Sequence, residues 1–236
     1  MKPELRIFQD SERLSRHAAN LFIEESNKSI RGRNRFLVAL NGGSTPTRLF
    51  QLLATEYRDQ IDWSKVHVFW GDERCVPPDD SGSNFHQANE LFLSKAPIPE
   101  NNIHRVQGEL DPATASKQYA ETLKTFADSN LDFPRFDLVY LGMGEDGHVG
   151  SLFPGAAESA TGRVAFVRQS PKPPAERLTL TRPMLASARR TILVATGEAK
   201  RVALERVLSA DLALPATGLP SLVIVTDLDL RSGGLR

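Results

Sequence analysis

The feature that most constrains the fold of this chain is the alternation of short apolar runs with amphipathic stretches. The apolar runs are rich in Val, Leu, Ile and Phe, as in strands buried on both faces of a parallel sheet. They occupy 35–40, 66–70, 136–142, 191–196 and 221–226. Helical periodicity lies between them, at 46–58, 84–94, 113–127 and 198–208. This order predicts a three-layer α/β fold with a mostly parallel, Rossmann-like sheet and helices on both faces.

The remaining segments extend this pattern without dividing it. A helix is expected from Ser11, because Leu14, Ala18, Leu21 and Phe22 would share one of its faces. Two further strands are expected at 163–168 and 177–181, on either side of a proline-rich turn. No internal repeat or long linker is present, although 154–175 is the loosest region. A chain of 236 residues is therefore expected to form one domain, 1–236.

Composition excludes several classes of partner. Lys and Arg number 29, as do Asp and Glu, so the chain has no electrostatic footprint for nucleic acid or an anionic membrane. One cysteine, Cys75, excludes an internal disulfide and a cysteine-rich zinc site. The first residues lack the apolar core of a signal peptide, and no apolar run approaches the roughly 20 residues that cross a bilayer. We expect a cytoplasmic protein with no membrane partner.

The first unusual strand-exit loop is NGGSTPTRLF. In open parallel sheets, ligands bind in the loops that follow the carboxyl ends of the strands. Gly42 and Gly43 allow a tight turn and a close approach to a ligand. Ser44 or Thr45 can cap a helix with Pro46 in its first turn, and a glycine loop before a helix N-terminus binds anions. A plain capped turn is the alternative, because neither a Walker loop nor a dinucleotide fingerprint is present.

The second loop, WGDERCVPPDDSGSNF, brings Asp72, Glu73 and Arg74 to the end of a strand. A solvated charged turn is the alternative, and a bare charge triplet favours it. The expected position beside the first loop favours a role in a site. A metal site at Asp72 and Glu73 has weak support, because no other carboxylate or histidine spacing resembles a metal-binding motif.

The third loop, LGMGEDGHVGSLFPG, surrounds His148 with glycines and acids. A histidine that titrates near neutrality and is oriented by a carboxylate is the usual general base for activating water. Gly142 and Gly144 can bring backbone amides close to a bound group. A histidine that caps a turn is the alternative. Structural roles are expected for the histidines in helix or strand patterns: His17, His67, His86 and His104.

Lys200 begins a helix after a strand and a glycine turn, where its ammonium could reach an anion at the sheet edge. A solvated surface lysine is the alternative. Cys75 has no apparent base partner, so it is not assigned as a nucleophile. Together the loops would form a cleft with a phosphate cradle, two acids, an arginine, a lysine and a histidine. These residues predict a metal-independent enzyme on a small phosphorylated substrate, with His148 transferring a proton or activating water.

Five stretches carry a resemblance to the 6-phosphogluconolactonases, within a larger family that includes the glucosamine-6-phosphate deaminases. They lie in order between residues 36 and 208: NGGSTP, DERCVP, LGMGEDGHVGSLFPG, SPKPPAERLTLTRPMLASAR and ATGEAK. The resemblance implies a deaminase-like three-layer fold and hydrolysis of 6-phosphogluconolactone, the second step of the oxidative pentose phosphate pathway. It also implies that no metal or organic cofactor takes part. The expected partner is a small sugar-phosphate lactone, and the chain is a monomer or a small homo-oligomer.

The resemblance also implies a role for each candidate residue. His148 activates the attacking water, while Asp72 and Asp146 orient groups around the reacting centre. Either Arg74 or backbone N–H groups at Gly142–Gly144 donate to the developing oxyanion. Substrate phosphate and carboxyl oxygens are expected to meet the remaining candidates and Arg74: Gly42, Gly43, Ser44, Thr45, Arg74, Arg177 and Lys200.

Two positions favour a lactonase over a deaminase within this family. Deaminases typically have tyrosine where this chain has Arg74, and glutamate seven residues after the aspartate of DGH, where this chain has Phe153. An apolar side chain cannot take part in that proton transfer. The family usually has aspartate where this chain has Gly82, a departure that could loosen the loop of Arg74, although Asp79 and Asp80 are near.

Three other functions are weighed against a lactonase. A sugar-phosphate isomerase or deaminase is disfavoured by Phe153 and Arg74. A sugar-phosphate sensor of the kind that carries a DNA-binding module is disfavoured by the zero net charge and by His148, for which a binder has no chemical need. A structural subunit without activity has no sequence feature in its favour.

Overall fold

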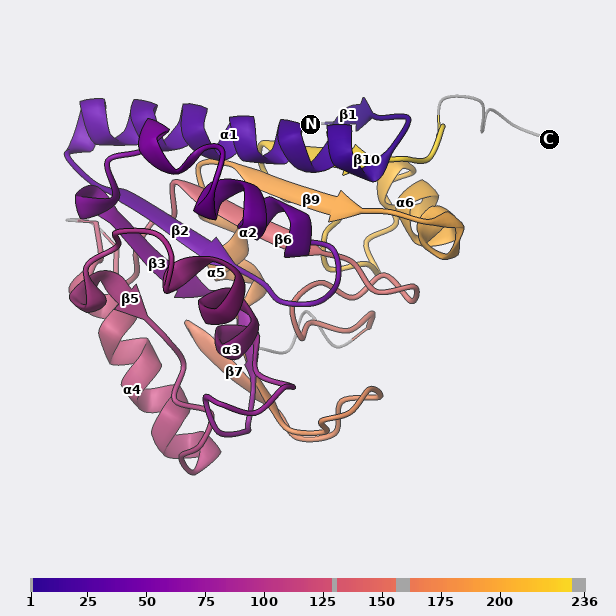
Figure 1. Ribbon diagram of the computed structural model, residues 1–236. Helices are drawn as coiled ribbons and strands as arrows, with labels where there is room; N and C mark the ends of the chain where they lie inside the picture. The colour runs from indigo at the N-terminus through magenta and orange to yellow at the C-terminus, as the bar shows by residue number, and fades with distance from the viewer. Residues whose placement is uncertain (1, 129–130, 156–161, 231–236) are drawn as a thin grey trace.

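Both ends of the chain contribute to one central sheet. The computed structural model describes residues 2–128, 131–155 and 162–230 (Figure 1). In this part of the chain the central sheet has seven strands, all parallel, in the order β1-β10-β9-β6-β2-β3-β5. Their bounds are β1 Glu4–Ile7, β2 Phe36–Leu40, β3 Val66–Trp70, β5 Ile103–His104, β6 Leu138–Gly142, β9 Thr191–Ala195 and β10 Leu222–Thr226.

Helices cover both faces of this sheet. Connections that run toward β5 carry α1, α2 and α3, and connections that run back toward β10 carry α4, α5 and α6. Because such crossovers are right-handed, the two groups lie on opposite faces, as α2 and α5 do in Figure 1. The predicted three-layer fold is therefore confirmed. The helices are α1 Ser11–Arg33, α2 Thr47–Ala54, α3 Asn84–Ala88, α4 Pro112–Thr125, α5 Arg182–Ala186 and α6 Arg201–Leu208.

The first helix begins at Ser11, as expected. Its N-cap is Asp10, whose carboxylate accepts a 2.8 Å hydrogen bond from the backbone N–H of Arg13. The expected apolar face of α1 is buried against the sheet and α2. The helix ends at Arg33, and its C-cap, Asn34, is in the left-handed region and donates its backbone N–H to the carbonyl of Ile30.

A second, antiparallel sheet branches off directly after β3. It consists of β4 (Asp72–Arg74), β8 (Arg177–Leu180) and β7 (Val164–Val167), in the order β4-β8-β7. Gly71 is the only residue between β3 and β4, and a Cβ at this position would lie 2.2 Å from Oδ1 of Asn41. The tight turn at Gly71 directs β4 away from the central sheet. The expectation of a charged loop at 72–74 is therefore wrong, because these residues pair with β8.

The sequence pattern located most elements but not all of them. The five apolar runs are β2, β3, β6, β9 and β10, with ends that differ by up to two residues. β1 and β5 were not expected, because they are short edge strands with polar side chains. The helix expected over 46–58 stops at Ala54. Residues 156–161 of the loosest region lie outside the described residues. Short helical turns occur at Arg58–Gln60, Trp63–Lys65, Asn89–Leu93, Glu100–Asn102 and Glu198–Lys200.

Candidate active site

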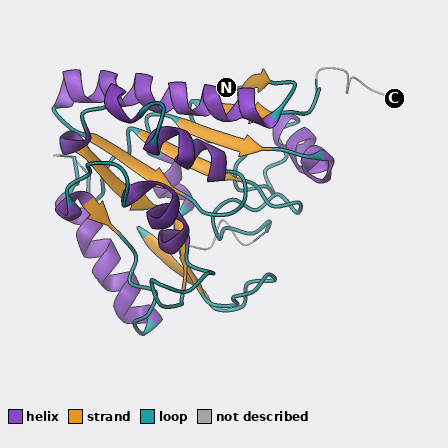
Figure 2. Cartoon of the chain, in the orientation of Figure 1, coloured by secondary structure: helices purple, strands orange, loops and turns teal. Residues whose placement is uncertain are grey.

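Four neighbouring strands end at the same edge of the central sheet. These adjacent, parallel strands are β9, β6, β2 and β3. Their exit loops therefore lie together beyond the arrowheads of the strands, drawn in teal in Figure 2. These loops and β8 line a cavity of about 310 Å³. All the candidate residues except Asp146 line it: Gly42, Gly43, Ser44, Thr45, Asp72, Arg74, Gly142, Gly144, His148, Arg177 and Lys200. The fold therefore brings together residues that are up to 158 positions apart, from Gly42 to Lys200.

His148 and Asp146 form a hydrogen-bonded pair at this cavity. Nδ1 of His148 lies 2.5 Å from Oδ1 of Asp146. A carboxylate accepts, so Nδ1 carries a proton, and in the neutral form of the imidazole the free lone pair is on Nε2. Partial burial acts to raise the pKa of Asp146, but the hydrogen bond and charge of His148 outweigh it and lower that pKa. Asp146 is thus an ionised group that orients the imidazole.

The glycines around His148 have two different functions. A Cβ on Gly144 would lie 2.1 Å from Nδ1 of His148, so this glycine makes room for the imidazole itself. Gly147 has a φ of 90°, which a side chain would strain. A Cβ on Gly142, in contrast, would meet no described atom within 4 Å, and this residue faces the cavity. Of these three glycines, Gly142 is the one whose missing side chain leaves room for a ligand.

Asp72 is buried and fully hydrogen-bonded. Its Oδ1 accepts from the side-chain amides of Asn41 at 3.0 Å and Asn84 at 3.1 Å, and its Oδ2 accepts from the Ser151 hydroxyl at 2.7 Å. These bonds join the exit loops of β2, β3 and β6. Sequence reasoning missed Asn41, Asn84 and Ser151 as site residues, although all three lie within motifs already quoted. Asp72 therefore orients neighbouring groups through a network.

Glu73 faces a different environment from Asp72. Its carboxylate accepts from the backbone N–H groups of Arg74, Asn84 and Phe85 and from the Ser83 hydroxyl, at 2.7 to 3.1 Å. Burial raises the pKa of Glu73, against these donors. The carboxylate holds the start of α3, so Asp72 and Glu73 do not present their oxygens to a common metal ion.

Two arginines lie side by side where β4 pairs with β8. Arg74 donates to the carbonyl of Gly82, while its buried Nε has no acceptor among the described residues. Asp80 accepts from the backbone N–H of Gly82 at 2.7 Å. The family usually has an aspartate at position 82. Here Asp80, two residues earlier, provides a carboxylate that holds the loop next to Arg74.

Arg177 is only 4% exposed and already has three acceptors. It donates to the carbonyls of Lys172, Pro173 and Pro174 at 2.9 to 3.1 Å, and so fixes the turn between β7 and β8. Burial lowers the pKa of Arg177, and the charge of Arg74 adds to this effect. The turn places Lys172, a cation that sequence reasoning missed, on the cavity wall with Lys200.

The glycine loop is held by side chains from α3. Gln87 accepts from the backbone N–H of Gly43 at 3.0 Å and donates to its carbonyl at 2.7 Å. A Cβ on Gly42 would lie 2.0 Å from Oδ1 of Asn84. The expectation that Ser44 or Thr45 caps α2 is wrong: Pro46 occupies the N-cap, and no side chain bonds there. Ser44 and Thr45 instead line the cavity.

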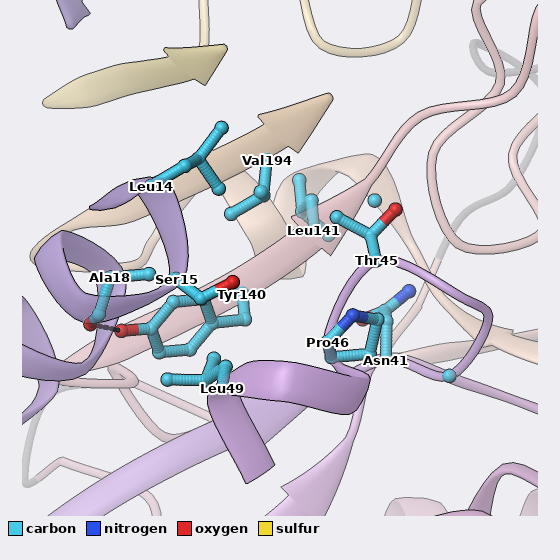
Figure 3. A pocket seen from close by; sticks show the side chains of 12 residues that line it. Leu14, Ser15, Ala18, Asn41, Thr45, Pro46, Leu49, Tyr140, Leu141 and Val194 are labelled. Atoms are coloured by element: carbon cyan, nitrogen blue, oxygen red, sulfur yellow. Dashed lines mark hydrogen bonds between the residues drawn. The ribbon is translucent and has the colours of Figure 1, made fainter. Parts of the chain in front are cut away.

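A second, apolar cavity lies beneath the glycine loop (Figure 3). Its volume is about 20 Å³, enough for about one water molecule. Leu14 and Ala18 of α1, Leu49 of α2 and Val194 of β9 line it, and Tyr140 donates its hydroxyl to the carbonyl of Ala18. This space is too small for a sugar phosphate, so the larger polar cavity is the candidate active site.

Comparison with known families identifies the group to which this architecture belongs. Residues 9–224 match the family described as glucosamine-6-phosphate isomerases/6-phosphogluconolactonase. The chain belongs to this family. Within the family, it is 37% identical over 226 residues to a protein of Arabidopsis thaliana named 6-phosphogluconolactonase 3, chloroplastic. The match covers 92% of this chain and 70% of that relative, and the chain spans about two thirds of the plastid relatives it matches.

Solved structures in the family show the same fold. The 6-phosphogluconolactonase of Thermotoga maritima superposes with a TM-score of 0.84 at 30% identity, covering 95% of this chain and 99% of the other. A monomeric glucosamine-6-phosphate deaminase superposes with a TM-score of 0.80 at 20% identity, covering 94% and 96%. Because both superpose well, the fold does not separate the two activities, and the residues at the cavity decide.

Proposed function

We propose that the chain is a 6-phosphogluconolactonase, which hydrolyses 6-phosphogluconolactone to 6-phosphogluconate in the pentose phosphate pathway. The observation that carries the proposal is the His148–Asp146 pair on a cavity walled by cations, with Phe153 packed against the imidazole. By the sequence resemblance, Phe153 stands where the deaminases have glutamate, and its ring offers no proton. The relatives at 30% identity and above that are named 6-phosphogluconolactonase support the same activity.

His148 is the general base of the proposed reaction. With Nδ1 bound to Asp146, Nε2 accepts a proton from a water molecule as the water oxygen bonds to the lactone carbonyl carbon. The tetrahedral intermediate then collapses, and the ester bond between that carbon and the ring oxygen breaks. The proton on Nε2 passes to the departing ring oxygen, so the enzyme returns to its starting state. The product carries a new carboxyl group, which releases its remaining proton to solvent and becomes a carboxylate. The step requires no metal or organic cofactor.

Arg74 is the better candidate for the donor to the oxyanion. The backbone N–H of Gly144 already donates to the carbonyl of His148 at 2.8 Å, so it is occupied. Arg74 lines the cavity and uses one N–H for the Gly82 carbonyl, and its other N–H groups have no acceptor among the described residues. A donor aimed at the developing oxyanion contributes a large part of the rate of such reactions.

In this proposal, Lys172 and Lys200 bind the phosphate group of the substrate. Lys172 and Lys200 line the cavity and form no ion pair within the described part of the chain, unlike most arginines of this protein. Ser44 and Thr45 add hydroxyl donors from the glycine loop. Arg177 contributes through the turn that it holds rather than as the main phosphate ligand, because its guanidinium already serves three carbonyls.

The proposal includes the setting of the enzyme. We propose one domain over residues 1–236, supported by the pairing of β1 with β10 from the two ends of the chain. Within the described residues, no helix combines the length and the apolar character needed to span a membrane. A cytoplasmic location and the absence of a nucleic acid partner stay predictions, and the relatives named as chloroplastic show that family members also occur in plastids.

The test is the rate of hydrolysis of freshly generated 6-phosphogluconolactone, measured against its spontaneous rate. The proposal expects a large acceleration, and no ammonia release from glucosamine 6-phosphate. Turnover of the amino sugar in place of the lactone would assign a deaminase. Binding of 6-phosphogluconate without any acceleration would assign a sensor.

A further inference from the structure

A third cavity, an open hollow, lies at the opposite end of the central sheet from the candidate active site. It has a volume of about 550 Å³ and is lined by the first residues of β1 and β10, the last turns of α1 and the residues just before β9. The strand arrows of Figure 1 point away from this end of the sheet. This hollow and the active-site cavity share no lining residue, so each can hold a ligand while the other is occupied.

Cations dominate the wall of this hollow. Six basic side chains line it, from four separate segments: Lys2, Lys28, Arg33, Arg135, Arg189 and Arg190. They share four carboxylates, since Asp137 pairs with both Arg33 and Arg189, and Glu25 with both Arg190 and Lys28. Glu4 and Asp128 are the others, and each also pairs with an arginine outside the hollow. The hollow thus carries excess positive charge in a chain of zero net charge.

Two cations of the hollow have no carboxylate partner among the described residues. The Nε of Arg190 is buried and has no hydrogen-bond partner among the described residues, whereas the Nε of Arg189 lies 3.3 Å from Oδ1 of Asp137. Lys2 and Arg135 form no ion pair in the described ranges, and Arg135 is held only through its Nε, which donates to the carbonyl of Ser187 at 3.2 Å. The ammonium of Lys2 and the other N–H groups of Arg135 are therefore available to a bound anion.

We propose that this hollow binds a small molecule with two or more phosphoryl groups. Guanidinium groups bind phosphoryl oxygens in pairs, and several arginines around one concave space suit an anion of multiple charge. Leu219 and Leu222 add apolar atoms to the wall, where a nucleoside could lie against them. The volume suits a nucleotide-sized ligand and excludes a nucleic acid duplex as its occupant.

The binding site is tested by titrating the protein with pyrophosphate and with ATP in a calorimeter, with 6-phosphogluconate at saturation to fill the active site. Saturable binding of both ligands is expected, weaker at high salt. Equal affinities would assign the polyphosphate group as the recognised element, and tighter binding of ATP would assign a nucleotide. Absence of saturable binding of either ligand would overturn the proposal, as would its loss when 6-phosphogluconate is added.

A charge-matched pair of variants locates the site. The double variant Lys28→Glu/Arg135→Glu alters two exposed cations of the hollow, and we expect it to raise the Kd of pyrophosphate by about tenfold or more. Lys117→Glu/Lys124→Glu changes the net charge equally on exposed positions of α4 and should leave the Kd unchanged. Circular dichroism and lactonase activity should be unchanged in both. Equal weakening in the two variants would overturn the proposal, because it would show a response to net charge alone.

Discussion

The ring of Phe153 packs against the ring of His148, with 4.8 Å between the centroids and 39° between the planes. The imidazole is therefore held on one side by a carboxylate, Asp146, and on another by an apolar ring. Its only acidic hydrogen-bond partner within the described residues is Asp146. This arrangement leaves Nε2 as a base toward the cavity.

A carboxylate at position 153 should change the pH dependence of the reaction. Phe153→Glu would place a negative charge beside His148 and favour the protonated imidazolium, which cannot act as a base. We expect the acid limb of the kcat/KM profile to move to higher pH, with lower activity at neutral pH. Phe153→Leu, which keeps the site apolar, serves as the control. If the acid limb of the glutamate variant did not move, a charge at position 153 would have no effect on the protonation of the general base, and the prediction would be wrong.

Removal of the base should abolish most catalysis without unfolding the chain. We expect His148→Ala to lower kcat by about 10²- to 10⁴-fold, the usual contribution of a general base. Asp146→Asn should lower kcat by less, because it disturbs the orientation of the imidazole rather than removing it. Steady-state kinetics with a melting curve for each variant checks both. Full activity in His148→Ala would keep the reaction and discard the mechanism.

Two glycines of the same loop should respond differently to alanine. In Gly144→Ala the new Cβ would overlap Nδ1 of His148, so we expect kcat to fall with the displaced imidazole. In Gly142→Ala the Cβ would enter the cavity without touching the described protein, so KM should rise while kcat changes less. Comparison of kcat and KM for the pair tests this difference. Identical profiles would show that the two glycines share one function.

Asp72 should prove to be a positioning residue. Asp72→Ala leaves the buried amide of Asn41 without its acceptor, which should cost about 1–3 kcal/mol of unfolding free energy, while the Asn84 amide keeps the backbone carbonyl of residue 72. Asp72→Asn should cost less, because its amide can still accept from both asparagines while the Ser151 hydroxyl turns to accept. Urea denaturation measures the cost, and lactonase assays follow. Equal loss of kcat in the stable asparagine variant would instead make the carboxylate itself a participant.

The stability of the fold should decline in acid because of two half-buried histidines, His67 and His104. Nδ1 of His67 lies 3.2 Å from Nε2 of His104, and His104 stacks on Phe69 at 4.5 Å. Burial, with the charge of His67, lowers the pKa of His104 from 6.5 to about 4, and burial lowers the pKa of His67.

In this window the unfolded chain binds protons that the native chain does not. The contribution of the two neutral histidines to the free energy of unfolding should therefore be complete above about pH 6.5. It should fall as the pH drops toward 4. Denaturation midpoints across this range measure the slope, and His104→Phe should reduce it. A midpoint that stays level between pH 6.5 and 4 would contradict the assignment.

Local pattern was sufficient for most of the fold. Apolar runs identified the inner strands, since strands buried on both faces are apolar throughout. The edge strands β1 and β5 were missed because they are short and partly polar, and they are strands only because a neighbour pairs with them. The same holds for β4, whose residues read as a charged loop until β8 pairs with them.

The motifs of the sequence indicated the candidate site but not its internal connections. Sequence reasoning placed Asp72 and Glu73 together, whereas the structure aims one carboxylate at Asn41, Asn84 and Ser151 and the other at the start of α3. Lys172 was missed because a lysine in a proline-rich turn carries no signal of its own, and Arg177 positions it.

By itself, the sequence determined the α/β class, the strand-exit loops and the residue types that can act on a sugar phosphate, because periodicity and motif spacing are local properties. Tertiary structure alone decided that β9, β6, β2 and β3 lie side by side, that Phe153 packs on His148, and that six scattered cations meet at the far end of the sheet. These relationships depend on strand order and side-chain packing between distant segments, and the free energy of such non-local contacts is not encoded in any one stretch of the chain.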